Sequence, residues 1–156
     1  MDSIGGAKMV LDDVTLTGTA SGTSTGLGAQ WNMTNGAGAA AVDIVNSHTS
    51  AGGNFYVSGF DGVTIQGNTF DAQGLALNGV KHASVTGNTF QNISEDFTAN
   101  GTQHRGLVIE DAWGTNGVSD VTVTGNTFHN IDAVDGAIAS NASPTARRRT
   151  PRPSPG

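Results

Sequence analysis

The chain of 156 residues has no cysteine, few charged side chains and no long apolar run. The absence of cysteine excludes a disulfide framework and thiol chemistry. No window approaches the roughly 18 consecutive apolar residues of a membrane-spanning helix, so we expect no membrane span. Charged residues make up 13% of the chain, against about a quarter in ordinary soluble domains, and hydrophobic residues make up 36%. The composition therefore excludes charge-driven disorder over most of the length and allows one domain with a core.

The few charges are distributed unevenly. Residues 1–142 hold all 13 acidic residues against three cations, Lys8, Lys81 and Arg105, which gives a net charge of −10. We expect this body to repel nucleic acid and to be able to attract divalent cations. Residues 143–156 contain four prolines and four arginines and no acid. Because such a segment cannot join a strand ladder or a core, we expect residues 141–156 to be a disordered basic tail, with a polyanion-binding arm as the alternative.

What the chain has in abundance is glycine and a repeated block of eight residues. The block occupies residues 63–70, 83–90 and 121–128, and each copy ends in Gly-Asn-Thr-Phe. Weaker copies begin at Val14 and Val42, so that the first residues of successive copies are 28, 21, 20 and 38 apart. A shortest period near 20 residues, lengthened where loops are inserted, is typical of a β-solenoid.

Each copy alternates apolar and polar residues with the period of a half-buried strand. In the first strong copy, Val63 and Ile65 are expected to point inward, and Thr64 and Gln66 outward. The glycine and asparagine that follow tolerate the left-handed backbone of a sharp turn. The closing phenylalanines are expected to stack in the core: Phe70, Phe90 and Phe128. A second family of strands is predicted between the copies, at residues 55–60, 74–80, 106–112 and 136–140.

Together these patterns resemble the right-handed parallel β-helix of the pectate-lyase-like superfamily, over about residues 7–140. The resemblance implies an all-β, single-stranded solenoid of about five coils, each with three strands. It also implies an asparagine ladder at the bend after each copy, which Asn68, Asn88 and Asn126 match, with Ser47 and Thr19 at that place upstream. An antiparallel sandwich is the alternative, but it does not explain a block that returns after 20 residues.

In that superfamily the substrate groove lies along the outer face of the parallel sheet that is counted first in the family, and here the second family of strands would form that sheet. Aligning the second family of strands predicts two outward rows there: Ser58, Asn78, Glu110 and Ser140, and above them Tyr56, Ala76, Val108 and Ile138. The insertion at residues 91–105 and neighbouring loops would add further polar and aromatic groups at the same edge: Glu95, Asp96, His104, Arg105, Trp113, Lys81 and His82.

These residue types suit chemistry on a uronate polymer. Such chemistry needs a base for the C5 proton and a cation beside the charge that develops. The catalytic candidates are Glu110, His104, Arg105, Lys81 and His82, and the sugar-binding candidates are Trp113, Asn78 and Tyr56. Calcium is the one cofactor expected, held by carboxylates among Glu95, Asp96, Glu110 and Asp111.

Each candidate also has a structural explanation, because solvated charges and tryptophans packed under loops are common. The chain has no Asp-Pro-His of the alginate epimerase type and no Arg-x-Pro-x-x-Arg of the pectate lyase type, so no family catalytic residue can be transferred. The leading hypothesis is a secreted bacterial module that contacts acidic polysaccharide as part of a lyase or C5-epimerase. The alternative is a structural stalk or adhesin segment.

An ice- or surface-binding solenoid ranks last, because its flat lattice would need identical coils. Residues 1–6 show no signal peptide, and the repeat stops in mid-coil after residue 140. We therefore expect residues 1–140 to be a piece of a longer solenoid. It should be monomeric unless coils stack end to end.

Overall fold

The computed structural model describes residues 8–17, 31–34, 40–94, 106–111, 117–132 and 137–141. Within these ranges the chain is all-β, with strands joined by short turns and no helix. The strands are β1 (Lys8–Asp12), β2 (Thr15–Thr17), β3 (Trp31–Thr34), β4 (Ala41–Val45), β5 (His48–Ser58), β6 (Asp61–Gln66), β7 (Thr69–Asn78), β8 (Lys81–Thr86), β9 (Thr89–Ser94), β10 (Leu107–Glu110), β11 (Ser119–Thr124), β12 (Thr127–Asp132) and β13 (Ile138–Asn141). The described part contains no helix long and apolar enough to cross a bilayer.

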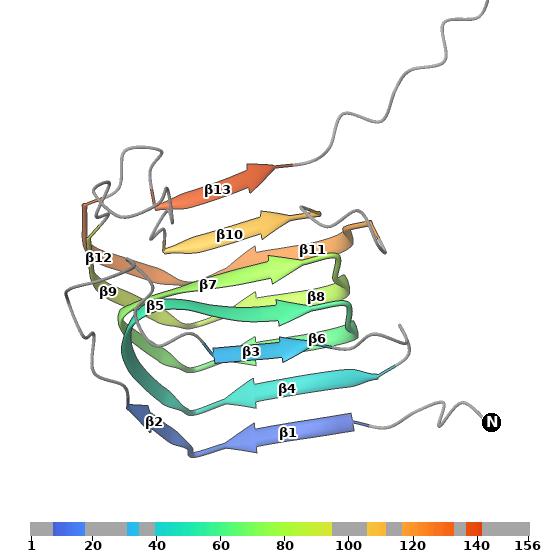
Figure 1. Ribbon diagram of the computed structural model, residues 1–156, viewed down its shortest axis with the longest axis horizontal. Coiled ribbons are helices and arrows are strands. Elements are labelled where there is room, and N and C mark those ends of the chain that lie inside the picture. Colours follow the sequence, from blue (N-terminus) through green and yellow to red (C-terminus); the bar gives the residue numbers. More distant parts are fainter. Residues whose placement is uncertain are drawn as a thin grey trace, which may run out of the picture.

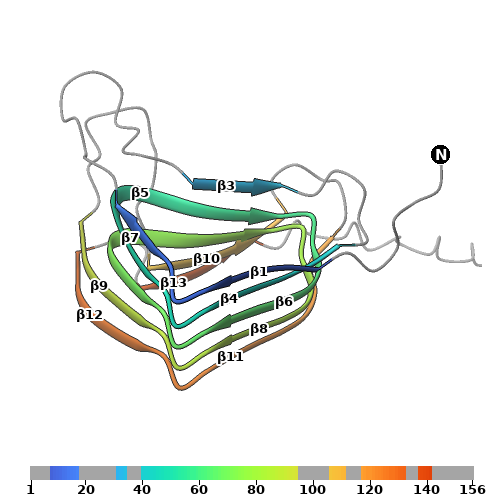
Figure 2. The ribbon, with the colours of Figure 1, turned by 90° about the horizontal axis from the view of Figure 1, so that it is seen from below.

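The strands form two sheets in which every strand pair is parallel. The first sheet has the order β1-β4-β6-β8-β11. The second contains β12-β9-β7-β10-β13, and in it β5 pairs with β2, β3 and β7. The long strands β5 and β7 pair with each other and bend near their middle. The first half of β5 lies beside β2 and its second half beside β3. The first half of β7 lies beside β9 and its second half beside β10. The first sheet is the first face of the molecule, and the bent second sheet forms the other two. The second face contains β2, β9, β12 and the first halves of β5 and β7, and the third face contains β3, β10, β13 and the second halves of β5 and β7. The strands stack as a β-solenoid (Figures 1 and 2).

A residue with a left-handed backbone conformation turns the chain from the first sheet to the second face. Gly67, Gly87 and Gly125 have φ of 66°, 65° and 64° at this place, and Asp13 and Asn46 have φ of 54° and 51°. Glycine adopts this conformation without steric cost, and aspartate and asparagine are the side chains that tolerate it best. The turn chemistry of the repeated block is therefore confirmed.

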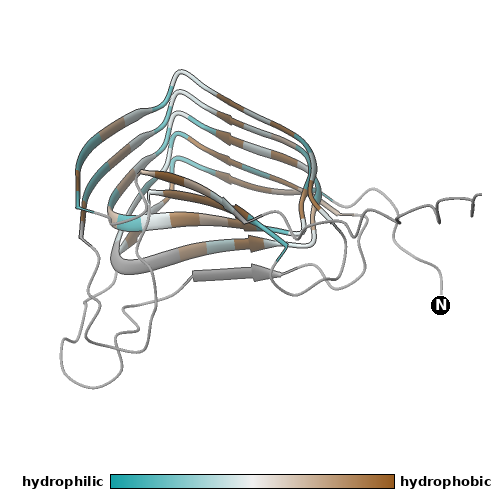
Figure 3. Ribbon diagram, turned by 90° about the horizontal axis from the view of Figure 1, so that it is seen from above, coloured by the Kyte–Doolittle hydropathy of each residue, from teal (hydrophilic) through white to brown (hydrophobic). Residues whose placement is uncertain are grey.

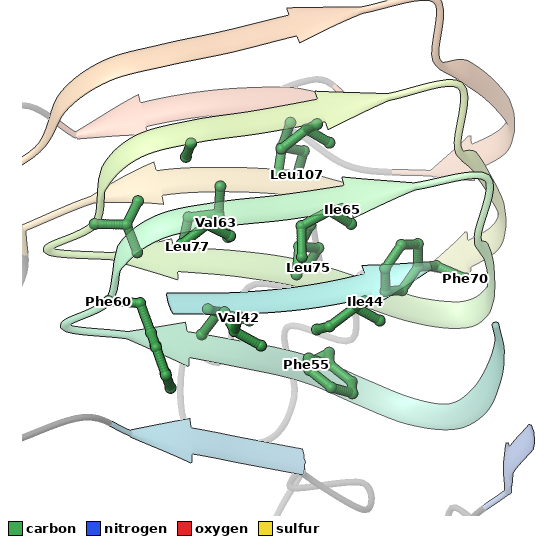
Figure 4. Packing of buried hydrophobic residues seen from close by; sticks show 14 of the residues in the cluster. Val42, Ile44, Phe55, Phe60, Val63, Ile65, Phe70, Leu75, Leu77 and Leu107 are labelled. Carbon is green, nitrogen blue, oxygen red and sulfur yellow. The ribbon is translucent and has the colours of Figure 1, made fainter. Parts of the chain in front are cut away.

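The core lies between the faces and is built from columns of matching side chains. Val63 and Ile65 are buried as predicted, whereas Thr64 is partly exposed and Gln66 exposed. Figure 3 shows hydrophobic and hydrophilic segments alternating along the strands, and Figure 4 shows the buried side chains meeting between the sheets. The predicted aromatic stack is present, with ring centroids 4.8 Å apart for Phe70 and Phe90 and 4.9 Å for Phe90 and Phe128.

The asparagine ladder is also confirmed. The backbone N–H of Ser47 donates to Oδ1 of Asn68, that of Asn68 to Oδ1 of Asn88, and that of Asn88 to Oδ1 of Asn126, each at 2.9 Å. The Nδ2 groups of Asn68 and Asn88 donate to the same oxygens, also at 2.9 Å. Each asparagine Nδ2 further donates to a main-chain oxygen of the preceding repeat, at Ile44, Ile65 or Val85.

The prediction for the first repeat was wrong by part of a turn. Its strand in the first sheet is β1, which pairs Met9 with Val42 and Leu11 with Ile44, and not the segment that begins at Val14. Because the chain turns at Asp13, Val14 rather than Thr19 holds the ladder position, and its N–H donates to Oγ of Ser47 at 3.1 Å.

Candidate functional site

The third face carries most of the predicted outward rows. Strand pairing sets Ser58 beside Asn78 and Asn78 beside Glu110, as predicted. It likewise aligns Tyr56, Ala76 and Val108 on the same three strands.

The two positions predicted on β13 are wrong by one residue. Asn141 lies beside Glu110 in place of Ser140, and Ala139 lies beside Val108 in place of Ile138. Ile138 pairs instead with Leu107, which is fully buried. Ile138 thus follows the inward column of Leu107, and its exposed fraction is 46%.

Burial divides the outward row into covered and accessible positions. The exposed fractions of Ser58 and Asn78 are only 4% and 3%. In the second row Ala76 and Val108 are buried as well, and only Tyr56 of that row and Glu110 of the first are partly exposed. Of the described residues in these two rows, Tyr56 and Glu110 are therefore the ones accessible to a ligand.

The corner after the third face brings the second part of the predicted cluster close. The N–H of Gly79 donates to the main-chain oxygen of Glu110 at 2.9 Å. Two residues later β8 begins with Lys81, which is partly exposed, and His82, which is exposed. Glu110, at the end of β10, thus lies near the turn that leads from β7 into Lys81 and His82 of β8, at one corner of the solenoid.

At this corner His82 lies between two aspartates of neighbouring repeats. Its Nδ1 is 2.6 Å from Oδ1 of Asp61, and its Nε2 is 3.6 Å from Oδ2 of Asp120. Because a carboxylate only accepts hydrogen bonds, Nδ1 carries a proton and donates it to Asp61. This bond and the charge of Asp61 raise the pKa of His82, and Asp120 adds to the effect while Lys81 opposes it.

The aspartate partners were missed in the sequence, although the repeat spacing contains them. Asp120 follows His82 by 38 residues, the interval that separates Asn88 from Asn126. Asp61 precedes His82 by 21 residues, one short repeat plus one position. The 38-residue interval would have placed Asp120 beside His82, whereas Asp61 aligns with Lys81 and contacts His82 from that neighbouring position.

A pH titration tests this arrangement. Because the pKa of His82 is raised in the folded chain, its contribution to stability is complete below the unfolded value near 6.5 and is lost as the pH rises through the folded value. We expect the histidine proton resonances of His82 to titrate above its ordinary value. In Asp61→Asn the titration should move toward lower pH, because the strongest acceptor is gone. An unchanged midpoint in that variant would contradict the hydrogen bond.

The remaining predicted ligands are only partly within the described residues. Asp111 follows β10, and its buried Oδ1 has no hydrogen-bond partner within the described ranges. Across the described ranges no group of three histidine, aspartate or glutamate side chains could hold a metal ion, and the calcium expected from the sequence stays a prediction. The other predicted residues of the cluster lie outside the described residues: Glu95, Asp96, His104, Arg105 and Trp113.

Comparison of the chain with protein-family models, with curated proteins and with solved structures found no match.

Proposed function

We propose that the chain is a polysaccharide-contacting module on a right-handed parallel β-helix of about five coils, similar to the pectate-lyase-like superfamily. We further propose that it is a secreted bacterial protein whose partner is an acidic, uronate-type polymer. The observation that carries this proposal is the corner where the hydrogen bond from Gly79 to the main-chain oxygen of Glu110 brings Glu110 close to Lys81 and His82, with Tyr56 on the same third face two strands away.

Each group at this corner suits one part of an acidic sugar. The ring of Tyr56 offers an apolar surface for a sugar face, with its hydroxyl as a polar end. Lys81 is a point charge for a uronate carboxylate, and protonated His82 adds positive charge beside it, with its ring nitrogens turned toward Asp61 and Asp120. Glu110 accepts hydrogen bonds from sugar hydroxyls. Tyr56 on β5 and Glu110 on β10 are separated by β7, two strand spacings of about 4.8 Å across the sheet, so they would contact different units of the polymer.

Binding is supported more directly than turnover. A base that removes the C5 proton must be unprotonated, and the raised pKa of His82 lowers the neutral fraction of this imidazole. Lyase or epimerase chemistry would then depend on Glu110, or on His104 and Arg105 from the insertion. Contact with the polymer is therefore the proposed function, and turnover is measured in the same experiment.

The test is incubation of the chain with alginate, pectate and chondroitin, with and without calcium. We expect calorimetry to show binding to at least one polymer. Lys81→Gln should weaken it about fivefold, which corresponds to ~1 kcal/mol for one exposed ion pair. Lys8→Gln on β1 is the matched control and should bind as the unaltered chain does, because β4 and β6 separate β1 from β8.

Ultraviolet absorbance of unsaturated ends and C5 inversion by proton NMR would detect lyase or epimerase turnover in the same samples. Equal binding by the two lysine variants would contradict this site.

A structural stalk is the second candidate, favoured by the continuous ladder and aromatic stack along the solenoid. Such columns make a rigid spacer whatever its outer faces bind. The absence of binding to all three polymers, by a chain shown to be folded, would favour the stalk.

A further inference from the structure

Equivalent residues in the last two repeats differ sharply in burial. Strand pairing aligns Val85 with Val123 and Phe90 with Phe128, and the ladder aligns Asn88 with Asn126. Val85 and Phe90 are 0% exposed and Asn88 is 1% exposed. Their partners one repeat later are all partly exposed. Within the described residues, β8 has a strand on each side but β11 has only β8, so the last repeat lacks a covering layer (Figure 1).

The partly exposed side chains of β11, β12 and the turn between them form what we call the end surface: Val121, Val123, Asn126, Phe128 and Ile131. Four of the five are apolar and pack against the core. The fifth is the last residue of the asparagine ladder.

The ladder has a direction, and its open end lies on the end surface. Backbone and Nδ2 donors of Asn68 point to Oδ1 of Asn88, and those of Asn88 point to Oδ1 of Asn126. Oδ1 of Asn126 is thus used, and its Nδ2 donates to the oxygen of Val85. The N–H of Asn126 makes no hydrogen bond to any described residue. Continuation of the ladder therefore requires an acceptor oxygen above Asn126.

The opposite end of the ladder is closed. Val14 donates its N–H to Oγ of Ser47 and has no polar side-chain atom to offer. A second copy stacked head to tail would set this valine over Asn126 and leave donors buried without acceptors. Since each such donor costs about 1–3 kcal/mol, a second copy is a poor occupant.

We propose that the end surface binds a further parallel β-solenoid repeat. This partner is a strand, a left-handed turn and a second strand, with asparagine, aspartate or serine at the ladder position. It would extend the interface that already joins β8 to β11 and β9 to β12. Serine suffices chemically, because Oγ of Ser47 already accepts the N–H of Val14. Recognition combines edge pairing, apolar cover for Phe128 and an acceptor for Asn126.

The probe is a synthetic peptide of residues 81–94, which comprises β8, the Gly-Asn turn and β9. Hydrogen exchange of the full chain with this peptide at about millimolar concentration should slow at residues 119–132 and stay unchanged at residues 8–17. A peptide with Asn88→Ala should bind about tenfold more weakly, because the acceptor for Asn126 is lost. A peptide with Thr86→Ala, which keeps the acceptor, should bind like the original.

Four results would each overturn the proposal. They are no slowing with the original peptide, slowing at residues 8–17 instead, equal binding by the Asn88→Ala peptide, and a free chain in which residues 119–132 already exchange as slowly as residues 81–94. Head-to-tail association of the full chain without peptide would likewise replace the proposed partner with a second copy.

Discussion

Replacing Asn88 by alanine is expected to lower the free energy of unfolding by about 3 kcal/mol. Oδ1 of Asn88 accepts the backbone N–H and the Nδ2 group of Asn68, and its own Nδ2 donates to the oxygen of Ile65 and to Asn126. Asn88 is 1% exposed, so water cannot easily replace it. Alanine would therefore leave several buried polar groups without partners.

The control for this variant is Gln66→Ala. Gln66 has an amide side chain like that of Asn88, but it lies on β6 and is exposed. Its replacement should change the free energy of unfolding by less than about 0.5 kcal/mol. Chemical denaturation followed by circular dichroism measures both variants, and equal small effects would mean that the ladder does not hold the repeats together.

Replacing Gln73 by leucine is expected to raise the free energy of unfolding by about 2 kcal/mol. Gln73 is 0% exposed, and neither its Nε2 nor its Oε1 has a hydrogen-bond partner among the residues that the structure describes. Two residues before it, Asp71 aligns with Gln91, so the following repeat carries the apolar Ile93 at this place. An apolar side chain of similar size removes the cost of the buried amide and keeps the volume filled.

Gln66→Leu serves as the control, because it is the same change at an exposed position and should be nearly neutral. A fall in stability in Gln73→Leu, with no change in the control, would show that the buried amide is stabilised by a partner such as a bound water. Comparison of the variants at Asn88, Gln73 and Gln66 shows whether a buried side-chain amide stabilises this fold only when its hydrogen bonds are made.

The repeated block allowed the first sheet, the turn and the aromatic stack to be predicted, and the resemblance to parallel β-helices added the ladder. Successive parallel strands place equal positions side by side, so a residue such as Asn88 meets its counterparts in the neighbouring repeats. Inward alternation fixes the register, because a slip would expose the core. The first repeat was misplaced because Lys8–Asp12 shares no motif with the block and only its apolar positions, Met9 and Leu11, match.

The candidate site was predictable only where it follows the same register. Tyr56, Asn78 and Glu110 fall on aligned strands, and their relative places came directly from the alternation. The aspartates beside His82 lie near the start of β6 and β11. The second residue of β6, β8 and β11 has a left-handed backbone, at Gly62, His82 and Asp120, and the apolar pattern does not reveal this bend. Residues of the long insertion have no equivalent in other repeats, so repeat spacing gives them no position.

The most direct test of the parallel stack of repeats is a nuclear Overhauser measurement on the aromatic rings. In the stacked solenoid the ring of Phe90 lies 4.8 Å from that of Phe70 and 4.9 Å from that of Phe128. We expect strong cross-peaks from Phe90 to both rings and none between Phe70 and Phe128, which are separated by two strand spacings of about 4.8 Å each. Direct cross-peaks between Phe70 and Phe128, or antiparallel contacts between Hα protons of adjacent strands, would contradict the parallel stack.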